Sequence, residues 1–294
     1  MIKYLVTGCN GFIGKNFINF VKKTRKDVEI FGFGLDPGSY ASEIEYTPVE
    51  LTDFDKTKER VREIKPDYIF HFAGVHSSDD LEKLMDGNVK TTISILEAAK
   101  NLYNTKILVV GSAAEYGKPK ELPVKETHEL RPISNYGASM VRRSEVALMF
   151  AEEGVNVSIG RLFNPIGYGL GEKLALGAFA KQIEGIESGI QKEIVVRDLS
   201  AKRDFIDIDD ANKAFLAIAE KGNRGEAYNV CSGEAHTLRE ILDLMLKERA
   251  VQANIVEKGE KSVIPEIYGS IEKIREHTDW KPRIAIQESI KKLF

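Results

Sequence analysis

The chain has 294 residues, of which 43% are hydrophobic and 30% charged, a composition that excludes disordered, collagen-like and coiled-coil proteins. Lys and Arg number 42 against 45 Asp and Glu, so the formal net charge of −3 offers no basic field for nucleic acid. The opening apolar segment is too short for a signal peptide or a membrane span, and we expect a cytoplasmic protein without a membrane partner. The two cysteines, Cys9 and Cys231, indicate neither a disulfide framework nor a metal site.

Apolar and amphipathic segments alternate along the first half of the chain. We expect strands at about 2–7, 28–33, 68–73, 106–110 and 155–162, and helices at about 12–21, 55–64, 89–102 and 137–153. The strands are continuous apolar runs, which is typical of strands that are buried on both faces. The alternation therefore predicts an α/β fold with a doubly wound parallel sheet that is covered by helices on both faces.

A glycine-rich loop, residues 7–14, follows the first expected strand. Gly8, Gly11 and Gly14 stand between a strand and a helix, where they allow a tight turn and a close backbone approach to a pyrophosphate at the helix N-terminus. This pattern predicts a dinucleotide-binding site. Asp36, just beyond the second strand, could bind the ribose of NAD, but a turn aspartate before Pro37 explains it equally well. The choice between NAD and NADP stays open.

The regular alternation ends near Asn164, where Pro165 and several glycines follow. We expect a domain boundary at this point. Residues 1–164 would form the dinucleotide-binding domain, rejoined by part of 204–232, and residues 165–294 would form a smaller C-terminal α/β lobe that binds the substrate.

Several motifs together resemble the extended short-chain dehydrogenase/reductase family, the NAD-dependent epimerases and dehydratases of nucleotide sugars. They are the glycine loop, Ser112 ahead of Tyr116-Gly117, Asn135-Tyr136-Gly137-Ala138-Ser139, Arg161-Leu162-Phe163-Asn164 and Arg203-Asp204-Phe205-Ile206-Asp207. Within the family, residues 179–189 and 202–205 are most similar to GDP-4-keto-6-deoxy-D-mannose reductases. The resemblance implies a Rossmann fold, NAD(H) or NADP(H) as cofactor, a nucleotide-diphosphate sugar as substrate, and a homodimer formed through the helices near 89–102 and 137–153.

The resemblance also implies roles for single residues. Those expected to hold the cofactor are Gly8, Gly11, Phe12, Ile13, Gly14, Glu50, Leu51 and Ala73, with Asp36 and Tyr136 as further candidates. Ser112 would donate to the sugar C4 oxygen, and Tyr136 would be the catalytic acid. Asn164 and Arg203 would bind the diphosphate, because an amide and a forked guanidinium suit phosphate oxygens. Arg203 could instead pair with Asp204 or Asp207, and Ser112 could be an ordinary strand-end serine.

Met140 departs from the family pattern, in which a lysine stands four residues after the catalytic tyrosine. That lysine would share a helix face with Tyr136, lower the pKa of the phenol and hold the nicotinamide ribose. Arg142 and Arg143 lie nearby, but we expect them to point away from Tyr136. Without a neighbouring cation the phenol stays protonated at neutral pH and can donate a proton but not accept one. Met140, as a natural or an engineered residue, therefore favours a reductase and predicts lowered activity.

Three hypotheses follow from this pattern. The first is an NAD(P)H-dependent reductase of a nucleotide-linked 4-keto-6-deoxyhexose. The second is a 4-epimerase or 4,6-dehydratase with bound NAD, although Ala114 stands where the dehydratases carry an acid, and Glu115 should face the other way. The third is a non-catalytic protein that binds the dinucleotide or the sugar nucleotide.

Overall fold

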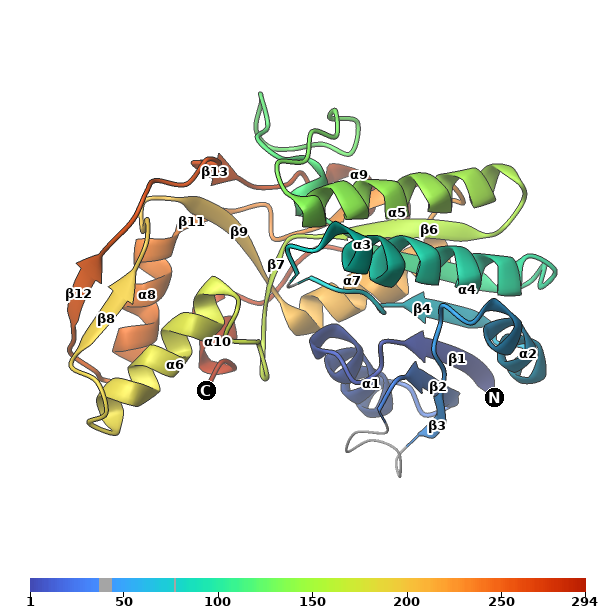
Figure 1. Cartoon of the computed structure of the whole chain (residues 1–294), viewed down its shortest axis with the longest axis horizontal. Coiled ribbons are helices and arrows are strands. Elements are labelled where there is room, and N and C mark those ends of the chain that lie inside the picture. The colour runs from blue at the N-terminus through green and yellow to red at the C-terminus, as the bar shows by residue number, and fades with distance from the viewer. Residues whose placement is uncertain (37–43, 77) are drawn as a thin grey trace.

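A computed structural model describes residues 1–36, 44–76 and 78–294 as two lobes (Figure 1). The larger lobe is built on a seven-stranded sheet with the order β10-β6-β5-β4-β1-β2-β3. All the pairings in this sheet are parallel. Its strands are β1 (Ile2–Thr7), β2 (Val28–Gly34), β3 (Glu45–Pro48), β4 (Tyr68–His71), β5 (Lys106–Ser112), β6 (Val157–Leu162) and β10 (Ala227–Val230). The predicted doubly wound parallel fold is confirmed.

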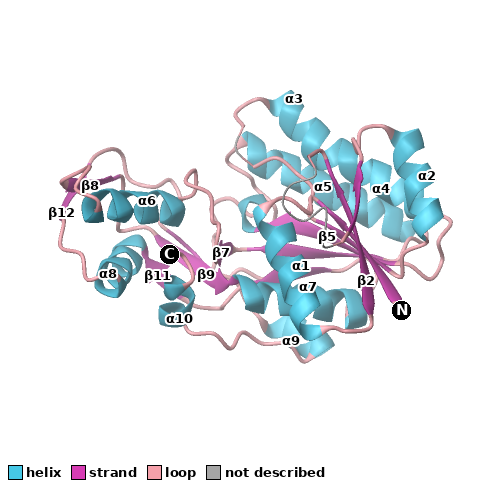
Figure 2. Cartoon of the chain, turned by 90° about the horizontal axis from the view of Figure 1, so that it is seen from below, coloured by secondary structure: helices cyan, strands magenta, loops and turns pink. Residues whose placement is uncertain are grey.

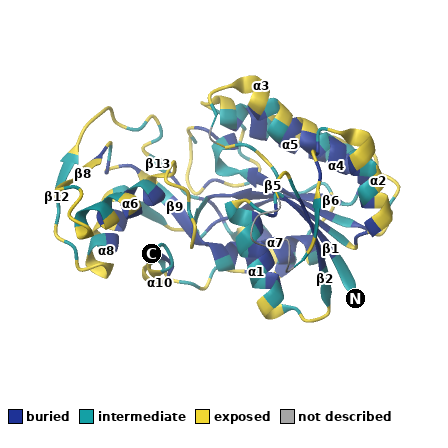
Figure 3. Ribbon diagram, turned by 60° about the horizontal axis from the view of Figure 1, so that its bottom comes forward, coloured by how far each residue is buried: buried dark blue, intermediate teal, exposed yellow. Residues whose placement is uncertain are grey.

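Helices cover both faces of this sheet, with their buried residues turned toward it (Figure 3). The buried side chains form one apolar cluster on each face. One face packs against α1 (Phe12–Thr24), α7 (Ile208–Lys221) and α9 (Glu272–Thr278). The other packs against α2 (Phe54–Ile64), α4 (Thr91–Ala99) and α5 (Asn135–Glu152). The strands are buried on both sides, which explains why their sequences are continuous apolar runs.

Two helices begin earlier than the sequence pattern predicts, and in each case a polar cap is the reason. The segment expected to start near residue 89 starts with α3 (Leu81–Leu84) and a π-helical turn, η1 (Met85–Lys90), before α4. The Asp80 carboxylate accepts hydrogen bonds from the first N–H groups of α3. Similarly, α5 starts at Asn135 because the Ser134 hydroxyl accepts from the Gly137 N–H at 3.0 Å.

The smaller lobe has its own apolar core and short strands. Its elements are β7 (Asn164–Ile166), α6 (Ala175–Glu187), β8 (Glu193–Val196), β9 (Lys202–Asp207), β11 (Ala235–Thr237), α8 (Leu238–Glu248), β12 (Asn254–Glu257), β13 (Glu266–Ile267) and α10 (Ile286–Lys291). β9 lies between β11 and β13 and also pairs with β7, next to the larger lobe (Figure 2). Between β9 and β11 the chain returns to the large lobe to form α7 and β10. The division of the chain into domains at residue 164 stays a prediction.

Phe70 gives a test of the core on the α1 face. It is fully buried, and its ring centroid lies 4.4 Å from that of Phe17 and 5.1 Å from that of Tyr4. We expect Phe70→Ala to lower the free energy of unfolding by about 3–5 kcal/mol because it leaves a cavity. Urea denaturation measures this loss. Tyr103→Ala, at an aromatic residue that is 87% exposed, should change it by less than about 0.5 kcal/mol, and equal losses in the two variants would contradict the packing described.

Candidate active site

The glycine loop after β1 packs directly against the chain that leaves β4. Gly8 has a φ of 65°, and a Cβ atom there would lie 2.6 Å from the Ala73 nitrogen, so only glycine fits. A Cβ atom on Gly14 would lie 2.3 Å from the Gly8 carbonyl oxygen. Gly11 precedes α1, and no side chain of the described residues caps this helix, so its first N–H groups are open to a ligand. This cradle fits the pyrophosphate of a dinucleotide.

His71, at the end of β4, is fully buried under this loop. Thr92 Oγ1 donates to the Asn88 carbonyl at 2.7 Å, so it must accept from His71 Nε2 at 3.0 Å. His71 Nδ1 then accepts from the Thr7 hydroxyl at 2.7 Å, and Thr7 accepts from the Ala73 N–H at 3.2 Å. Burial holds the pKa of His71 well below its usual value. The imidazole is therefore neutral, with its proton on Nε2, and it joins the glycine loop to α4.

Asn88 holds the chain that follows β4. Its side chain is buried, accepts from the Val75 N–H at 2.7 Å and donates to the Val75 carbonyl at 2.9 Å. It also donates to the Ser139 hydroxyl at 2.9 Å. Asn88 thus connects the chain after β4 with the helix that carries Tyr136.

Ser112 and Tyr136 lie at the same edge of the sheet, where parallel strands end and ligands bind in this type of fold. Ser112 ends β5, and its hydroxyl accepts from the Ala114 N–H at 3.2 Å. Tyr136 lies in the first turn of α5 and lines a cleft of about 590 Å³. The other walls of the cleft are the chain after β4, which includes His76, and the residues before α6, which include Lys173.

The pKa of Tyr136 is raised from its ordinary value, chiefly by burial. A hydrogen bond from Ser112 and the positive charge of Arg143 act in the opposite direction. The expectation that Arg143 points away from Tyr136 is wrong, because residues seven apart return to nearly the same face of a helix. Arg142 does point away, and it pairs with Glu145 at 2.5 Å on the surface. The prediction of a phenol that is protonated at neutral pH holds, with burial as its main cause.

Met140, at the family's lysine position, is buried on the inner side of α5. Glu115 is buried as well, and its carboxylate accepts from the Ser112 N–H at 2.7 Å and the Ser144 hydroxyl at 2.8 Å, and pairs with Arg161 at 2.8 Å. Residues 113–115 form a 3₁₀ turn instead of continuing the strand, so strand alternation does not apply to Glu115. Its carboxylate is held inside the protein by these partners.

Three further candidates for cofactor binding follow β2 and β3. Asp36 is exposed just after β2, and its carbonyl oxygen accepts from the Asn10 side chain. Glu50 is exposed, and its carboxylate accepts from the Thr52 hydroxyl at 2.9 Å. Leu51 is buried in the core beside α2. Their roles in holding an adenosine stay predictions.

The two residues expected to bind the diphosphate lie in the smaller lobe. Asn164 starts β7 and donates to the Asp204 carbonyl at 2.7 Å, so part of its amide holds β7 to β9. Arg203, on β9, donates to the Ser262 hydroxyl at 2.9 Å and to the Lys202 carbonyl. No carboxylate among the described residues pairs with Arg203, which does not support the alternative of an ion pair. Neither side chain lines the cleft at Tyr136.

The sequence analysis missed several residues around this site. His76 and Lys173 line the cleft, and no motif marks either of them. Ser134 could have been found, because a serine just before a helical pattern is a strong cap signal. The inward position of Arg143 could have been found from its spacing of seven residues.

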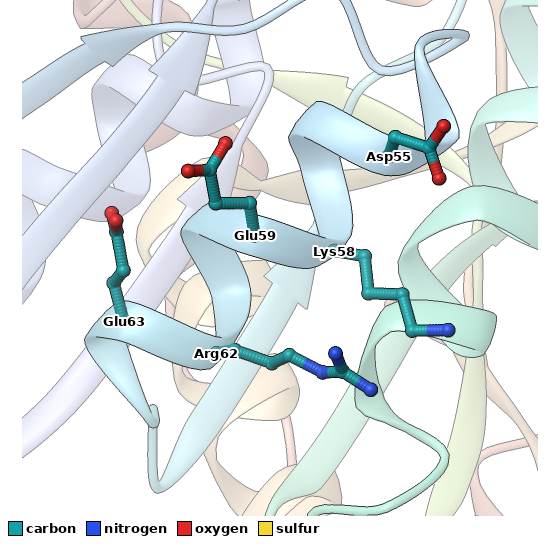
Figure 4. A pocket seen from close by; sticks show the side chains of 5 residues that line it. All are labelled: Asp55, Lys58, Glu59, Arg62 and Glu63. Carbon is teal, nitrogen blue, oxygen red and sulfur yellow. The ribbon is translucent and has the colours of Figure 1, made fainter.

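A second depression lies along α2, and it is lined by five charged side chains of that single helix: Asp55, Lys58, Glu59, Arg62 and Glu63. Figure 4 shows them spreading to different sides of the helix, and this pattern is typical of a solvated surface. Among the described residues, no cluster of three or more His, Cys, Asp or Glu side chains could hold a metal ion. Within the same residues, no helix has the length and apolar character needed to cross a bilayer.

Comparisons with known proteins agree with this geometry. The chain is 27% identical to a GDP-6-deoxy-D-mannose reductase of Pseudomonas aeruginosa, over 98% of this chain and 95% of the relative. It is 29% identical to a putative UDP-glucose 4-epimerase of Methanocaldococcus jannaschii, over 98% of this chain and 96% of the relative. The structure of RMD from Pseudomonas aeruginosa complexed with NADPH matches with a TM-score of 0.88 and 26% identity, over 99% of this chain and 97% of the other. A model of the NAD dependent epimerase/dehydratase family matches residues 4–231, and the chain belongs to this family.

Proposed function

We propose that the chain is an NAD(P)H-dependent reductase of a nucleotide-linked 4-keto-6-deoxyhexose, of the GDP-4-keto-6-deoxymannose type. The observation that carries the proposal is Tyr136, a half-buried phenol in the cleft whose pKa is raised, so that it is a proton donor at neutral pH. Reduction of a ketone needs such a donor. The 27% identity to a GDP-6-deoxy-D-mannose reductase supports the same direction.

The cofactor would lie along the edge of the sheet. Gly8, Gly11 and Gly14 would hold its pyrophosphate, together with the backbone at Phe12 and Ile13. Ala73 would lie beside it, because the Ala73 backbone packs against Gly8. When bound, the reduced nicotinamide supplies the hydride. Whether NADH or NADPH binds stays open, since Asp36 is an exposed residue with no basic neighbour in sequence.

The substrate's C4 oxygen would lie between Ser112 and Tyr136. Ser112 orients this oxygen, and Tyr136 gives it a proton as negative charge develops there. Arg203 would bind the diphosphate, since its guanidinium has no carboxylate partner among the described residues and its contact with Ser262 leaves other N–H groups available. Asn164, at the start of β7, would add an amide contact.

A nucleotide-sugar 4-epimerase is the second candidate, and the 29% identity to a putative UDP-glucose 4-epimerase favours it. Such an enzyme first oxidises an alcohol, which requires the phenolate form of Tyr136. The raised pKa of this phenol disfavours that form at neutral pH. A 4,6-dehydratase would also need an acid at Ala114, and the neighbouring Glu115 is bound to Arg161 inside the protein.

The reductase is tested by following NADH and NADPH oxidation with GDP-, dTDP- and UDP-linked 4-keto-6-deoxyhexoses. We expect turnover with the GDP-linked sugar, and a kcat lower by about 10²–10⁴-fold in Tyr136→Phe, which lacks the acidic proton. Tyr103→Phe, at an exposed tyrosine, is the matched control. Oxidised cofactor that copurifies and is never consumed would indicate the epimerase or dehydratase. Cofactor binding without turnover of any substrate would indicate the non-catalytic binding protein.

Gly14→Ala tests the cofactor cradle. The added Cβ atom would lie 2.3 Å from the Gly8 carbonyl oxygen and 2.8 Å from the Cys9 Cα atom, so the loop must shift away from the helix. We expect the dissociation constant for NADPH to rise by at least about tenfold, or about 1.4 kcal/mol. Titration calorimetry measures it. Gly171→Ala, where nothing lies within 4 Å of the added atom, should bind NADPH as the unchanged chain does, and the idea fails if Gly14→Ala also binds normally.

We further propose a cytoplasmic homodimer that forms through α5. Met149 is 60% exposed on this helix, and the neighbouring Val146, Leu148 and Phe150 are half-buried, whereas α4 is mostly buried within one protomer. We expect sedimentation to show a dimer, and Met149→Lys to shift it toward monomer by placing charges at the interface. Ile190→Lys, at an exposed residue of the smaller lobe, is the control. A monomeric unchanged chain would exclude the dimer.

A further inference from the structure

Arg143 is the largest fully buried side chain of the described protein, with 1% of its surface exposed. It lies on α5 seven residues after Tyr136, which at about 100° per residue leaves it about 20° from the Tyr136 direction. Met140 lies about 40° away by the same arithmetic. The tyrosine, the methionine and the arginine therefore share one face of the catalytic helix.

The guanidinium of Arg143 reaches the edge of the sheet where the site lies. Nη1 donates to the Ala73 carbonyl at 2.8 Å, and Nη2 donates to the His71 carbonyl at 2.7 Å. A Cβ atom on Gly74 would lie 3.0 Å from Nη1, so the group also touches the chain after β4. Among the described residues, Nε is buried without a hydrogen-bond partner.

Among the described residues, the positive charge of this group has no ion-pair partner. No carboxylate of the described residues lies within ion-pair distance of Arg143, and its charge acts on Tyr136, Glu115 and the neutral His71. Glu115 is already paired with Arg161 at 2.8 Å. A buried charge without a partner is unfavourable unless a ligand or a reacting group uses it. Burial lowers the pKa of Arg143 to about 10, so it stays charged at neutral pH.

We propose that Arg143, two helical turns after Tyr136 on α5, supplies the positive charge that the family's lysine would supply one turn after Tyr136. Met140 stands at that lysine position and carries no charge. This inference rests on the proposed function. When Tyr136 gives its proton to the C4 oxygen, its own O–H bond breaks and a phenolate remains in a half-buried site. Arg143 stabilises that phenolate through its charge. It acts through Tyr136, and its role is that of a positioning residue.

Other charged or titratable groups near Tyr136 do not replace this charge. Glu115 acts on Tyr136 with the opposite sign, and His71 is neutral. In the cleft, Tyr136 shares the walls with His76, Asp79 and Lys173. Burial, and next the charge of Lys173, lowers the pKa of His76, so that His76 is uncharged at neutral pH. Lys173 is not among the groups that shift the pKa of Tyr136.

The test compares the pKa of Tyr136 in five forms of the full chain with oxidised cofactor bound. They are the unchanged chain, Arg143→Gln, Arg143→Lys, Met140→Lys and the double variant Arg143→Gln/Met140→Lys. Near-ultraviolet phenolate absorbance reports this pKa when the spectrum of Tyr136→Phe is subtracted. Arg143→Gln keeps an N–H donor for a β4 carbonyl and lacks the charge. Arg142→Gln, at the exposed neighbour paired with Glu145, is the matched control.

We expect Arg143→Gln to raise the pKa of Tyr136, by about 1 unit or more, because the positive charge of Arg143 favours the phenolate. The alkaline limit of the reduction rate should move up with it, since reduction needs the protonated phenol. Arg143→Lys should keep most of the original pKa. In the Arg143→Gln background, Met140→Lys should bring the pKa of Tyr136 back to its original value. Beside the unchanged arginine, Met140→Lys should lower this pKa by less, because the two sites are coupled.

A folded Arg143→Gln with an unchanged pKa for Tyr136 would overturn the inference and leave Arg143 as a purely structural contact with β4. If Arg143→Gln does not fold, Arg143→Lys decides, because it keeps the positive charge. A Tyr136 pKa raised in Arg143→Lys by as much as complete loss of the charge should raise it would overturn the inference. The absorbance measurement needs no substrate, so its outcome for Arg143 is independent of whether the chain reduces a nucleotide sugar. A shift in Arg143→Gln, with no turnover of any nucleotide sugar by the unchanged chain, would sustain the role of Arg143 and reject the reductase.

Discussion

Beyond Phe72, whose N–H donates to the Thr7 carbonyl of β1, the backbone that leaves β4 relies on side chains to satisfy its polar groups, because buried N–H and carbonyl groups need partners. Side chains from three other elements supply them. Thr7 accepts from the Ala73 N–H, Asn88 binds both polar groups of Val75, and Arg143 donates to the carbonyls of His71 and Ala73. The edge of the sheet at which the cofactor would bind is therefore held in place by β1, η1 and α5 together.

This arrangement sets the chemistry of Tyr136. Tyr136 is half-buried in the first turn of α5, and burial has the largest effect on the pKa of its phenol. The charge of Arg143 and the Ser112 hydroxyl oppose burial without overcoming it. The balance leaves a proton donor at neutral pH, which suits reduction better than oxidation. The absence of the usual lysine thus removes one cation from a site that still contains another.

The two lobes are joined by the buried carboxylate of Asp204, on β9. It accepts from the Ser232 N–H and hydroxyl at 2.7 Å, from the Gly233 N–H at 2.9 Å and from the Gly269 N–H at 3.2 Å. Asn164 donates to its carbonyl oxygen. The strand that carries Arg203 is consequently fixed against the segment after β10, so the substrate-binding candidates of the smaller lobe are held relative to the larger sheet.

The sequence by itself determined the parallel fold, the glycine loop and the positions of Ser112 and Tyr136, because each depends on local patterns: apolar runs, glycines at a strand-to-helix turn, and motifs of adjacent residues. It did not determine the early start of α3, the cleft residues His76 and Lys173, or the contacts of Arg203. Only the tertiary structure decided what the Arg143 guanidinium binds, since its partners are the backbone carbonyls of His71 and Ala73, about seventy residues away. Such long-range pairing leaves no periodic signal in the chain.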